Sequence, residues 1–168
     1  MNYPIFLIGF MASGKTSKGK KLARKLNVPF IDLDQEVERQ EEQSISTIFD
    51  TQGEEYFRKL EAKIIRSYSK DLEVVVALGG GTPCFHNNLR YINDVGTSVY
   101  MKRSESRILG RLRENKQKRP LIANLNDEEL KVFIHTTMNT RTPYYEQANI
   151  VFDADNKQLS ELIDKLKF

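Results

Sequence analysis

The sequence has a single cysteine, no tryptophan and no long apolar run. Cys84 cannot form an intrachain disulfide, and no cysteine or histidine lies at metal-ligand spacing from it, so redox and zinc roles are not supported. No apolar stretch approaches the roughly 18 residues that span a bilayer. The apolar segment 5–8 has no basic segment before it and leads directly into a glycine loop, unlike a signal peptide. We therefore expect a soluble, cytoplasmic protein that does not act on membranes.

The net charge is also small, at +3, but the charges are unevenly distributed. Residues 102–119 contain eight Lys and Arg against two Glu, whereas residues 34–42 contain five acidic residues and one Arg. Such a basic stretch is often a solvated helix face. It lacks the interleaved aromatic residues of a nucleic-acid surface, so a phosphate-rich small ligand is favoured over nucleic acid.

The pattern of apolar runs predicts the fold. At 168 residues the chain is long enough for one domain with one core, which we place at residues 1–168. Short apolar runs that are typical of buried strands alternate with helical patterns. This alternation predicts a three-layer α/β/α fold with a five-stranded parallel sheet. The expected strands are 5–8, 28–31, 74–78, 97–101 and 149–152, and the expected helices include 15–26, 34–42, 54–67 and 127–138.

A glycine-rich loop follows the first expected strand. Residues 9–16, Gly-Phe-Met-Ala-Ser-Gly-Lys-Thr, match the phosphate-binding pattern G-x-x-x-x-G-K-[ST] at every fixed position, between a strand and a helix. The backbone N–H groups of such a loop and the helix N-terminus together bind phosphate. Lys15 is expected to reach the β- and γ-phosphates of ATP, and Thr16 to bind Mg²⁺ through its hydroxyl.

The acidic partner of the metal is less obvious. Many proteins with this loop place an aspartate at the end of a later strand, but the run 74–78 ends in glycine. Asp32, at the end of the second expected strand, is the best substitute. Its alternative role is that of a helix cap, in which aspartate is common.

Several further motifs resemble the shikimate kinase family, in order and in rough spacing, over nearly the whole chain. The combination of Asp-x-Asp, Phe-Arg, triple glycine and Arg-Pro-Leu is more specific than the phosphate-binding loop, which many enzymes share. The motifs are Gly-Phe-Met at 9–11, Phe-Ile-Asp-Leu-Asp at 30–34, Gly-Glu-x-x-Phe-Arg-x-x-Glu at 53–61, Gly-Gly-Gly-Thr at 79–82, Arg-Pro-Leu at 119–121 and Arg-x-x-Tyr-Tyr-x-x-Ala at 141–148.

The resemblance implies ATP-dependent phosphorylation of the 3-hydroxyl of shikimate, with Mg²⁺, giving shikimate 3-phosphate and ADP. It implies a P-loop kinase fold with a substrate-binding helical insertion at about 33–62 and a mobile lid at about 113–126. The implied catalytic residues are Lys15, Asp34 and Arg119. ATP would be bound by Gly9, Ala12, Ser13, Gly14, Lys15, Thr16, Ser17 and Arg119, shikimate by Asp34, Arg58, Gly79, Gly80, Gly81 and Arg141, and the metal by Thr16 and Asp32.

The proposed chemistry suits these residue types. The forked guanidinium groups of Arg58 and Arg141 match a planar carboxylate, and Asp34 is either the base or only a clamp for the substrate hydroxyls. The three glycines at 79–81 would let the backbone approach the substrate ring. Arg119 would neutralise charge on the transferred phosphoryl group.

The sequence is also compatible with other roles for Arg58 and with other functions for the chain. Arg58 could simply pair with Glu54 or Glu61 on its own helix. The chain could phosphorylate another small polyhydroxy acid such as gluconate, or could be a nucleotide-binding module without catalysis. The segment 153–159 lies where the family contacts adenine but offers no pattern that names the contacts. We expect a monomer whose partners are ATP and shikimate.

Overall fold

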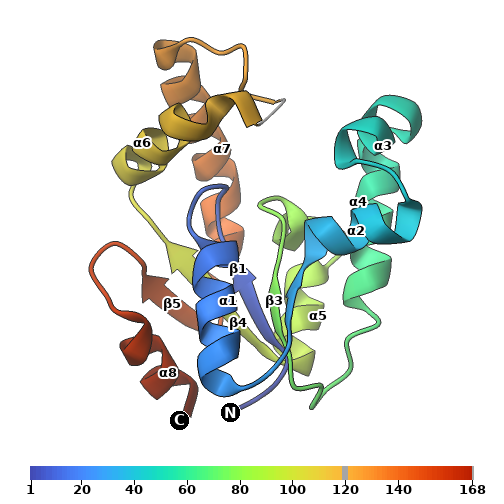
Figure 1. The fold of residues 1–168 in the computed structure, drawn as a ribbon, viewed down its shortest axis with the longest axis vertical. Helices are drawn as coiled ribbons and strands as arrows, with labels where there is room; N and C mark the ends of the chain where they lie inside the picture. The colour runs from blue at the N-terminus through green and yellow to red at the C-terminus, as the bar shows by residue number, and fades with distance from the viewer. Residues whose placement is uncertain (119–120, 168) are drawn as a thin grey trace.

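A central five-stranded sheet organises the structure, a computed structural model that describes residues 1–118 and 121–167. Its strand order is β2-β3-β1-β4-β5, and every neighbouring pair is parallel (Figure 1). The predicted five-stranded parallel sheet is thereby confirmed. The strands are β1 (Ile5–Ile8), β2 (Phe30–Asp32), β3 (Val75–Ala77), β4 (Thr97–Lys102) and β5 (Ile150–Asp153).

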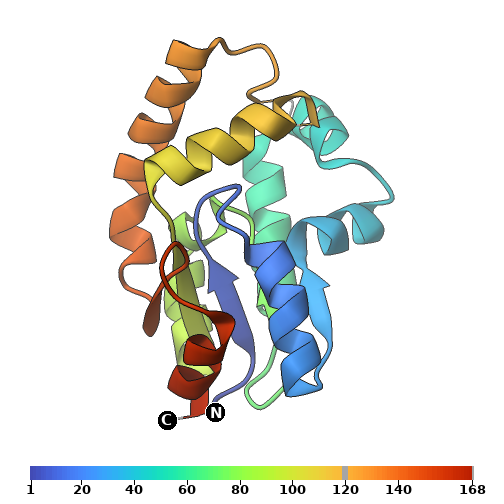
Figure 2. The same ribbon diagram turned by 60° about the vertical axis from the view of Figure 1, so that its left-hand side comes forward.

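Helices cover both faces of the sheet, which explains why β1 is apolar at every position and fully buried. Side chains alternate along a strand, so Ile5 and Leu7 pack on one face, and Phe6 and Ile8 on the other. The first face is covered by α1 (Lys15–Leu26) and α8 (Leu159–Lys167). The second face is covered by α4 (Glu54–Ile65), α5 (Asn88–Val95) and the C-terminal part of α7 (Asp127–Tyr145), which gives three layers (Figure 2).

Two groups of helices extend beyond the carboxyl ends of the strands. One contains α2 (Leu33–Glu41), α3 (Ile45–Gln52) and the start of α4, and the other contains α6 (Glu105–Asn115) and the start of α7 (Figure 1). Side-chain caps begin several of these helices: Asp32 accepts from the Asp34 N–H, and Asn126 forms a capping box with Glu129. Two short 3-10 segments, η1 (Thr82–Cys84) and η2 (Lys116–Lys118), complete the elements named here.

The structure differs from the sequence prediction at several element boundaries. Strand β2 begins at Phe30 because the Val28 N–H already bonds to Ala23 O at the end of α1, and Pro29 has no N–H to donate. Helix α7 continues past residue 138 and through Pro143, which places Arg141 on a helix. The predicted helices do not include α3, α5, α6 and α8, which have eight to eleven residues each. Among the described residues, no helix is long and apolar enough to cross a bilayer.

Candidate active site

The predicted phosphate-binding loop lies between β1 and α1, as the motif requires. Gly9 and Gly14 have φ values of +139° and +95°, a region that side chains rarely adopt, so the tight turn needs glycine at both positions. Lys15 Nζ donates to Gly9 O at 2.7 Å and to Phe10 O at 2.8 Å. The lysine therefore lies across its own loop, at the N-terminus of α1.

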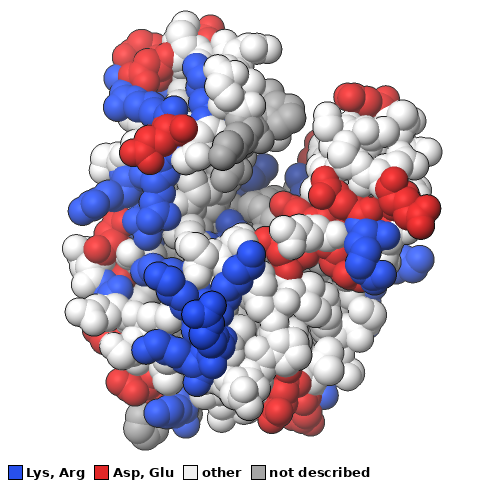
Figure 3. Space-filling view, viewed as in Figure 1, with Lys and Arg blue, Asp and Glu red and all other residues white. Residues whose placement is uncertain are grey.

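A cavity of about 720 Å³ opens beside this loop, within the size range of small-ligand sites. Figure 3 shows a hollow between the two groups of helices, with acidic side chains gathered over α2 and α3 and basic ones over α1. Among the residues that line the cavity, Lys15 and Arg111 can attract anions, while Asp32, Asp34 and Glu114 offer carboxylates. The lining residues are Met11, Ala12, Gly14, Lys15, Thr16, Ser17, Asp32, Asp34, Leu78, Gly79, Gly80, Arg111, Glu114 and Asn115.

Two oxygen-bearing side chains meet where the metal was predicted. Thr16 Oγ1 donates to Asp32 Oδ2 at 2.8 Å, while Asp32 Oδ1 accepts from the Asp34 N–H at 3.2 Å. Asp32 therefore caps α2 and also faces Thr16, so its two interpretations are compatible. In the described part of the chain no three His, Cys, Asp or Glu side chains are grouped as a metal site. One hydroxyl and one carboxylate suit Mg²⁺, which takes few protein ligands and completes its shell with phosphates and water.

Asp34 is the carboxylate with the most unusual electrostatic environment in the cavity. Burial raises its pKa to about 6, and the nearby Glu61 and Asp32 carboxylates add to the effect. Lys15 and Arg58 act in the opposite direction but do not cancel it. A carboxylate with a pKa close to neutrality can accept a proton from a hydroxyl group more readily than an ordinary aspartate.

The triple glycine after β3 brings the predicted acceptor residues together. A Cβ added at Gly79 would lie 3.0 Å from Asp34 Oδ1, and one at Gly80 would lie 3.1 Å from Arg141 Nη1. At Gly81 it would lie 2.6 Å from Arg58 Nη2. The glycines therefore make room for three site side chains, an explanation that adds to the predicted approach of the substrate ring.

Arg58 is held by the carboxylates of its own helix, as the alternative interpretation anticipated. Its Nε and Nη2 donate to Glu54 Oε1 at 3.1 and 3.0 Å, and its Nη1 donates to Glu61 Oε2 at 2.8 Å. The guanidinium also stacks 4.4 Å from the Phe85 ring centroid. Arg58 is 7% exposed, so these contacts fix its orientation beside Gly81.

Glu61 is a site residue that the sequence indicates only as a possible helix partner of Arg58. It is fully buried, accepts from Thr82 Oγ1 at the glycine turn and pairs with Arg58. Burial raises the pKa of Glu61, while the charge of Arg58 and the hydrogen bond from Thr82 oppose the rise. Glu61 thus links α4 to the turn after β3. Its place in the Phe-Arg-x-x-Glu motif was the available signal.

Two arginines on the other side of the loop were not singled out from the sequence. Arg111 Nη1 donates to Ala12 O at 3.1 Å, and Arg103 Nε donates to Ser13 O at 3.2 Å. Both belong to the basic stretch 102–119, whose preference for a phosphate-rich ligand was the only sequence signal. Arg103 also pairs with Asp155 at 3.1 Å, and this pair ties the loop to the segment after β5.

Some of the predicted site residues do not line the cavity. Gly9, Ser13, Gly81, Arg58 and Arg141 are not among its lining residues, although each lies in or against the phosphate-binding loop or the glycine turn. Arg119, predicted as a catalytic and ATP-binding residue, lies outside the described residues.

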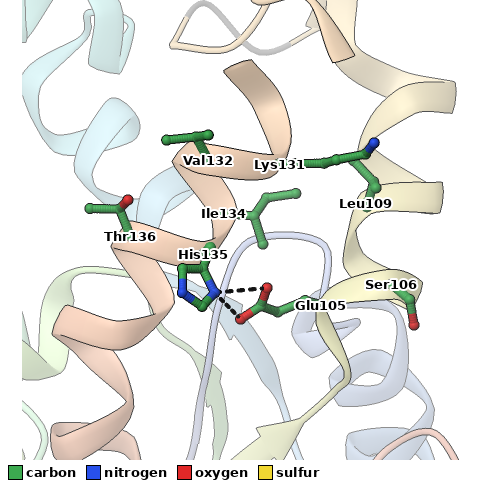
Figure 4. A pocket seen from close by; sticks show the side chains of 8 residues that line it. All are labelled: Glu105, Ser106, Leu109, Lys131, Val132, Ile134, His135 and Thr136. Atoms are coloured by element: carbon green, nitrogen blue, oxygen red, sulfur yellow. Dashed lines mark hydrogen bonds and ion pairs between the residues drawn. The ribbon is translucent and has the colours of Figure 1, made fainter. Parts of the chain in front are cut away.

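A second cavity, of about 440 Å³, lies between α6 and α7. Figure 4 shows Leu109 and Ile134 in this cavity, with His135 directed at Glu105. His135 Nδ1 lies 3.1 Å from Glu105 Oε1, and both side chains are exposed. The pair joins α6 to α7, which gives His135 a structural role at the surface.

Comparison with known proteins identifies the family of this chain. A family model described as shikimate kinase matches residues 11–167. The chain belongs to the shikimate kinase family. It is 41% identical over 167 residues to the shikimate kinase of Phocaeicola vulgatus, an alignment that covers 97% of this chain and 95% of that protein.

Solved shikimate kinase structures have the same fold. The enzyme from Bacteroides thetaiotaomicron superposes with a TM-score of 0.92, at 36% identity and over the full length of both chains. The shikimate kinase of Acinetobacter baumannii, solved in complex with shikimate, has a TM-score of 0.82 at 29% identity. This alignment covers 97% of this chain and 89% of that one. Membership of the family and the P-loop kinase fold are thus both established.

Proposed function

We propose that this chain transfers the γ-phosphoryl group of ATP to the 3-hydroxyl of shikimate, giving shikimate 3-phosphate and ADP. The observation that carries the proposal is the convergence of Asp34, Arg58 and Arg141 on one glycine turn beside the phosphate-binding loop. Two guanidinium groups and one carboxylate near a kinase cavity suit an acceptor that has both a carboxylate and hydroxyl groups. Family membership at 41% identity supports the same activity.

The nucleotide half of the site follows from the loop geometry. Backbone N–H groups of the loop and the N-terminus of α1 would bind the phosphates, and Lys15 would turn from its carbonyl partners to the β- and γ-phosphates. Thr16 and Asp32 would hold Mg²⁺, whose charge stabilises the transferring phosphoryl group. The proposed ATP-binding residues are Gly9, Ala12, Ser13, Gly14, Lys15, Thr16, Ser17 and Arg119.

The acceptor half of the site orients shikimate and moves one proton. Arg58 and Arg141 would bind the carboxylate, and the carboxylate of Asp34 would take the proton of the attacking hydroxyl. Gly79, Gly80 and Gly81 would form the floor of this half. We propose that Arg119 approaches the phosphoryl oxygens from a lid at about 113–126, and that residues 33–62 form the acceptor-binding insertion of a single domain.

The acceptor is tested by measuring ADP release with ATP and Mg²⁺ in the presence of shikimate, gluconate or nucleoside monophosphates. We expect turnover that depends on shikimate and product that carries phosphate on the 3-hydroxyl. Turnover that depends on gluconate would identify a kinase of another acid. Slow hydrolysis that no acceptor stimulates would identify a nucleotide-binding module. We also propose that the enzyme works as a cytoplasmic monomer.

The proposed binding of the shikimate carboxylate is tested with Arg141→Lys. Arg58 is less suitable, because it is buried against Glu61 and a replacement of Arg58 would also disturb packing. Lysine keeps the charge but loses the fork, so we expect kcat/KM for shikimate to fall by about 10- to 100-fold, the equivalent of one charged hydrogen bond. The KM for ATP should change little. Arg66→Lys is the matched control, because Arg66 donates to Asn88 and His86 O rather than to the glycine turn.

A shikimate analogue with a neutral hydroxymethyl group in place of the carboxylate sharpens this test. The unmodified enzyme should use the analogue poorly, and Arg141→Lys should lose little more, because the interaction is already absent. If the analogue were phosphorylated as well as shikimate, the arginines would have no role in substrate choice.

A further inference from the structure

Tyr145 links α7 to the glycine turn. Its side chain is fully buried, and its hydroxyl donates to Gly80 O at 2.5 Å, across 65 positions of the sequence. Arg141 lies one helical turn earlier on α7, and its guanidinium also faces Gly80. The charge of Arg141 opposes the rise in the pKa of Tyr145 that burial causes, as expected of neighbouring groups. One buried hydroxyl therefore bonds to the turn against which the arginine lies, and both residues come from the same helix.

We propose that Tyr145 is a positioning residue that sets the location of Arg141 for the carboxylate of the acceptor. This inference rests on the proposed function and assigns one of its specificity determinants. Arg141 has a long, flexible side chain, and a bidentate contact with a carboxylate needs the guanidinium in one orientation. The bond from Tyr145 to Gly80 O fixes the distance between α7 and the turn, and the hydroxyl held at Gly80 narrows the space open to the Arg141 side chain, which lies against the same glycine. Both effects depend on the hydroxyl and not on the ring.

The competing explanation is that Tyr145 only fills the core. Its ring packs 5.1 Å from the ring of Tyr100, a second buried tyrosine on β4. Burial raises the pKa of both phenols, so both remain hydrogen-bond donors at neutral pH. A hydrogen bond with Thr142, the neighbour of Arg141 on α7, opposes the rise in the pKa of Tyr100. Among the described interactions, the Tyr100 hydroxyl has no hydrogen bond to the glycine turn, unlike the hydroxyl of Tyr145. The two tyrosines thus offer a matched pair of hydroxyl deletions in one cluster.

The experiment compares Tyr145→Phe with Tyr100→Phe, after shikimate-dependent turnover of the unmodified enzyme has been established. We expect Tyr145→Phe to raise the KM and the calorimetric Kd for shikimate by about 5- to 10-fold, with the KM for ATP unchanged within about twofold. Tyr100→Phe should leave both KM values near normal. If the two variants raised the KM for shikimate equally, or if Tyr145→Phe raised the KM for ATP as much, Tyr145 would be a packing residue only.

A double variant tests whether Tyr145 acts through Arg141. If it does, Tyr145→Phe should cost little in the Arg141→Lys background, because the orientation that it sets is no longer used. Full additivity of the two losses would overturn the proposal. Should Tyr145→Phe fold poorly, Gly80→Ala tests the same geometry, because its Cβ would lie 3.1 Å from Arg141 Nη1. This variant should also raise the KM for shikimate with Tyr145 intact, and a normal KM would count against the proposal. An unmodified enzyme that shows no response to shikimate would instead refute the proposed function.

Discussion

Replacing Lys15 with methionine is expected to lower kcat by about 10²- to 10³-fold, the loss seen when one preorganised electrostatic contact to a transition state is removed. The lysine bonds to carbonyl groups of the phosphate-binding loop and lines the cavity, and in the proposed reaction its charge would neutralise the γ-phosphoryl group during transfer. Methionine retains most of the length and apolar stem of the side chain. The measurement is single-turnover formation of ADP at saturating ATP and shikimate.

The fold should tolerate the Lys15 change. The side chain is half-buried and bonds to two carbonyl groups of a loop on the cavity, so no core group is removed. Lys20→Met is the control, because Lys20 is exposed on the same helix and its ammonium lies 6.0 Å from the Phe30 ring. This control should keep kcat near normal. If kcat of Lys15→Met stayed within about threefold of the control, the proposed role of the loop in catalysis would be wrong.

Asp34→Asn is expected to reduce kcat by about 10²-fold or more, since asparagine keeps the shape of the side chain but cannot accept a proton. Asp34 lies in the first turn of α2 and lines the cavity, and the charges of Lys15 and Glu61 both influence its pKa. A loss confined to the KM for shikimate would make Asp34 a clamp for the hydroxyl groups, with the base elsewhere.

The pH dependence gives a second and independent test of Asp34. Its pKa is raised to about 6, so the carboxylate form is lost as the pH falls through that value. A base must be ionised, so kcat/KM for shikimate, which reports the groups of the enzyme before the acceptor binds, should fall on the acidic side with a midpoint near pH 6. In Asp34→Asn the residual rate should lack this limb. Glu38→Gln, a change on the same helix outside the cavity lining, should retain it.

The strands and the phosphate-binding loop were predictable because their signals are local. Four apolar residues before Gly9 specify a buried strand, and the eight-residue loop motif carries its own chemistry in consecutive positions. The predicted bounds of α1 are those observed, because Leu22, Ala23 and Leu26 lie on one helical face. The structure shows that Asn27 closes the helix in the left-handed conformation. Helix α7 extends beyond the predicted end at residue 138 and includes Pro143, a residue that is unfavourable inside a helix, because the tertiary packing of Met138 and Tyr145 continues it.

The sequence by itself determined the fold class, the identity of the phosphate-binding loop and, through its motifs, the family. The tertiary structure alone decided how the acceptor half is held together. The strand order places the turn at Gly79 to Gly81 beside the loop after β1, and residues from α2, α4 and α7 then meet on that turn. Periodicity contains no information on a contact such as that between Tyr145 and Gly80, which depends on how a distant helix packs on the sheet. The sequence likewise does not predict the contacts of Arg103 and Arg111. Their basic stretch indicates a charged surface, but it does not show which carbonyl groups of the loop accept their hydrogen bonds.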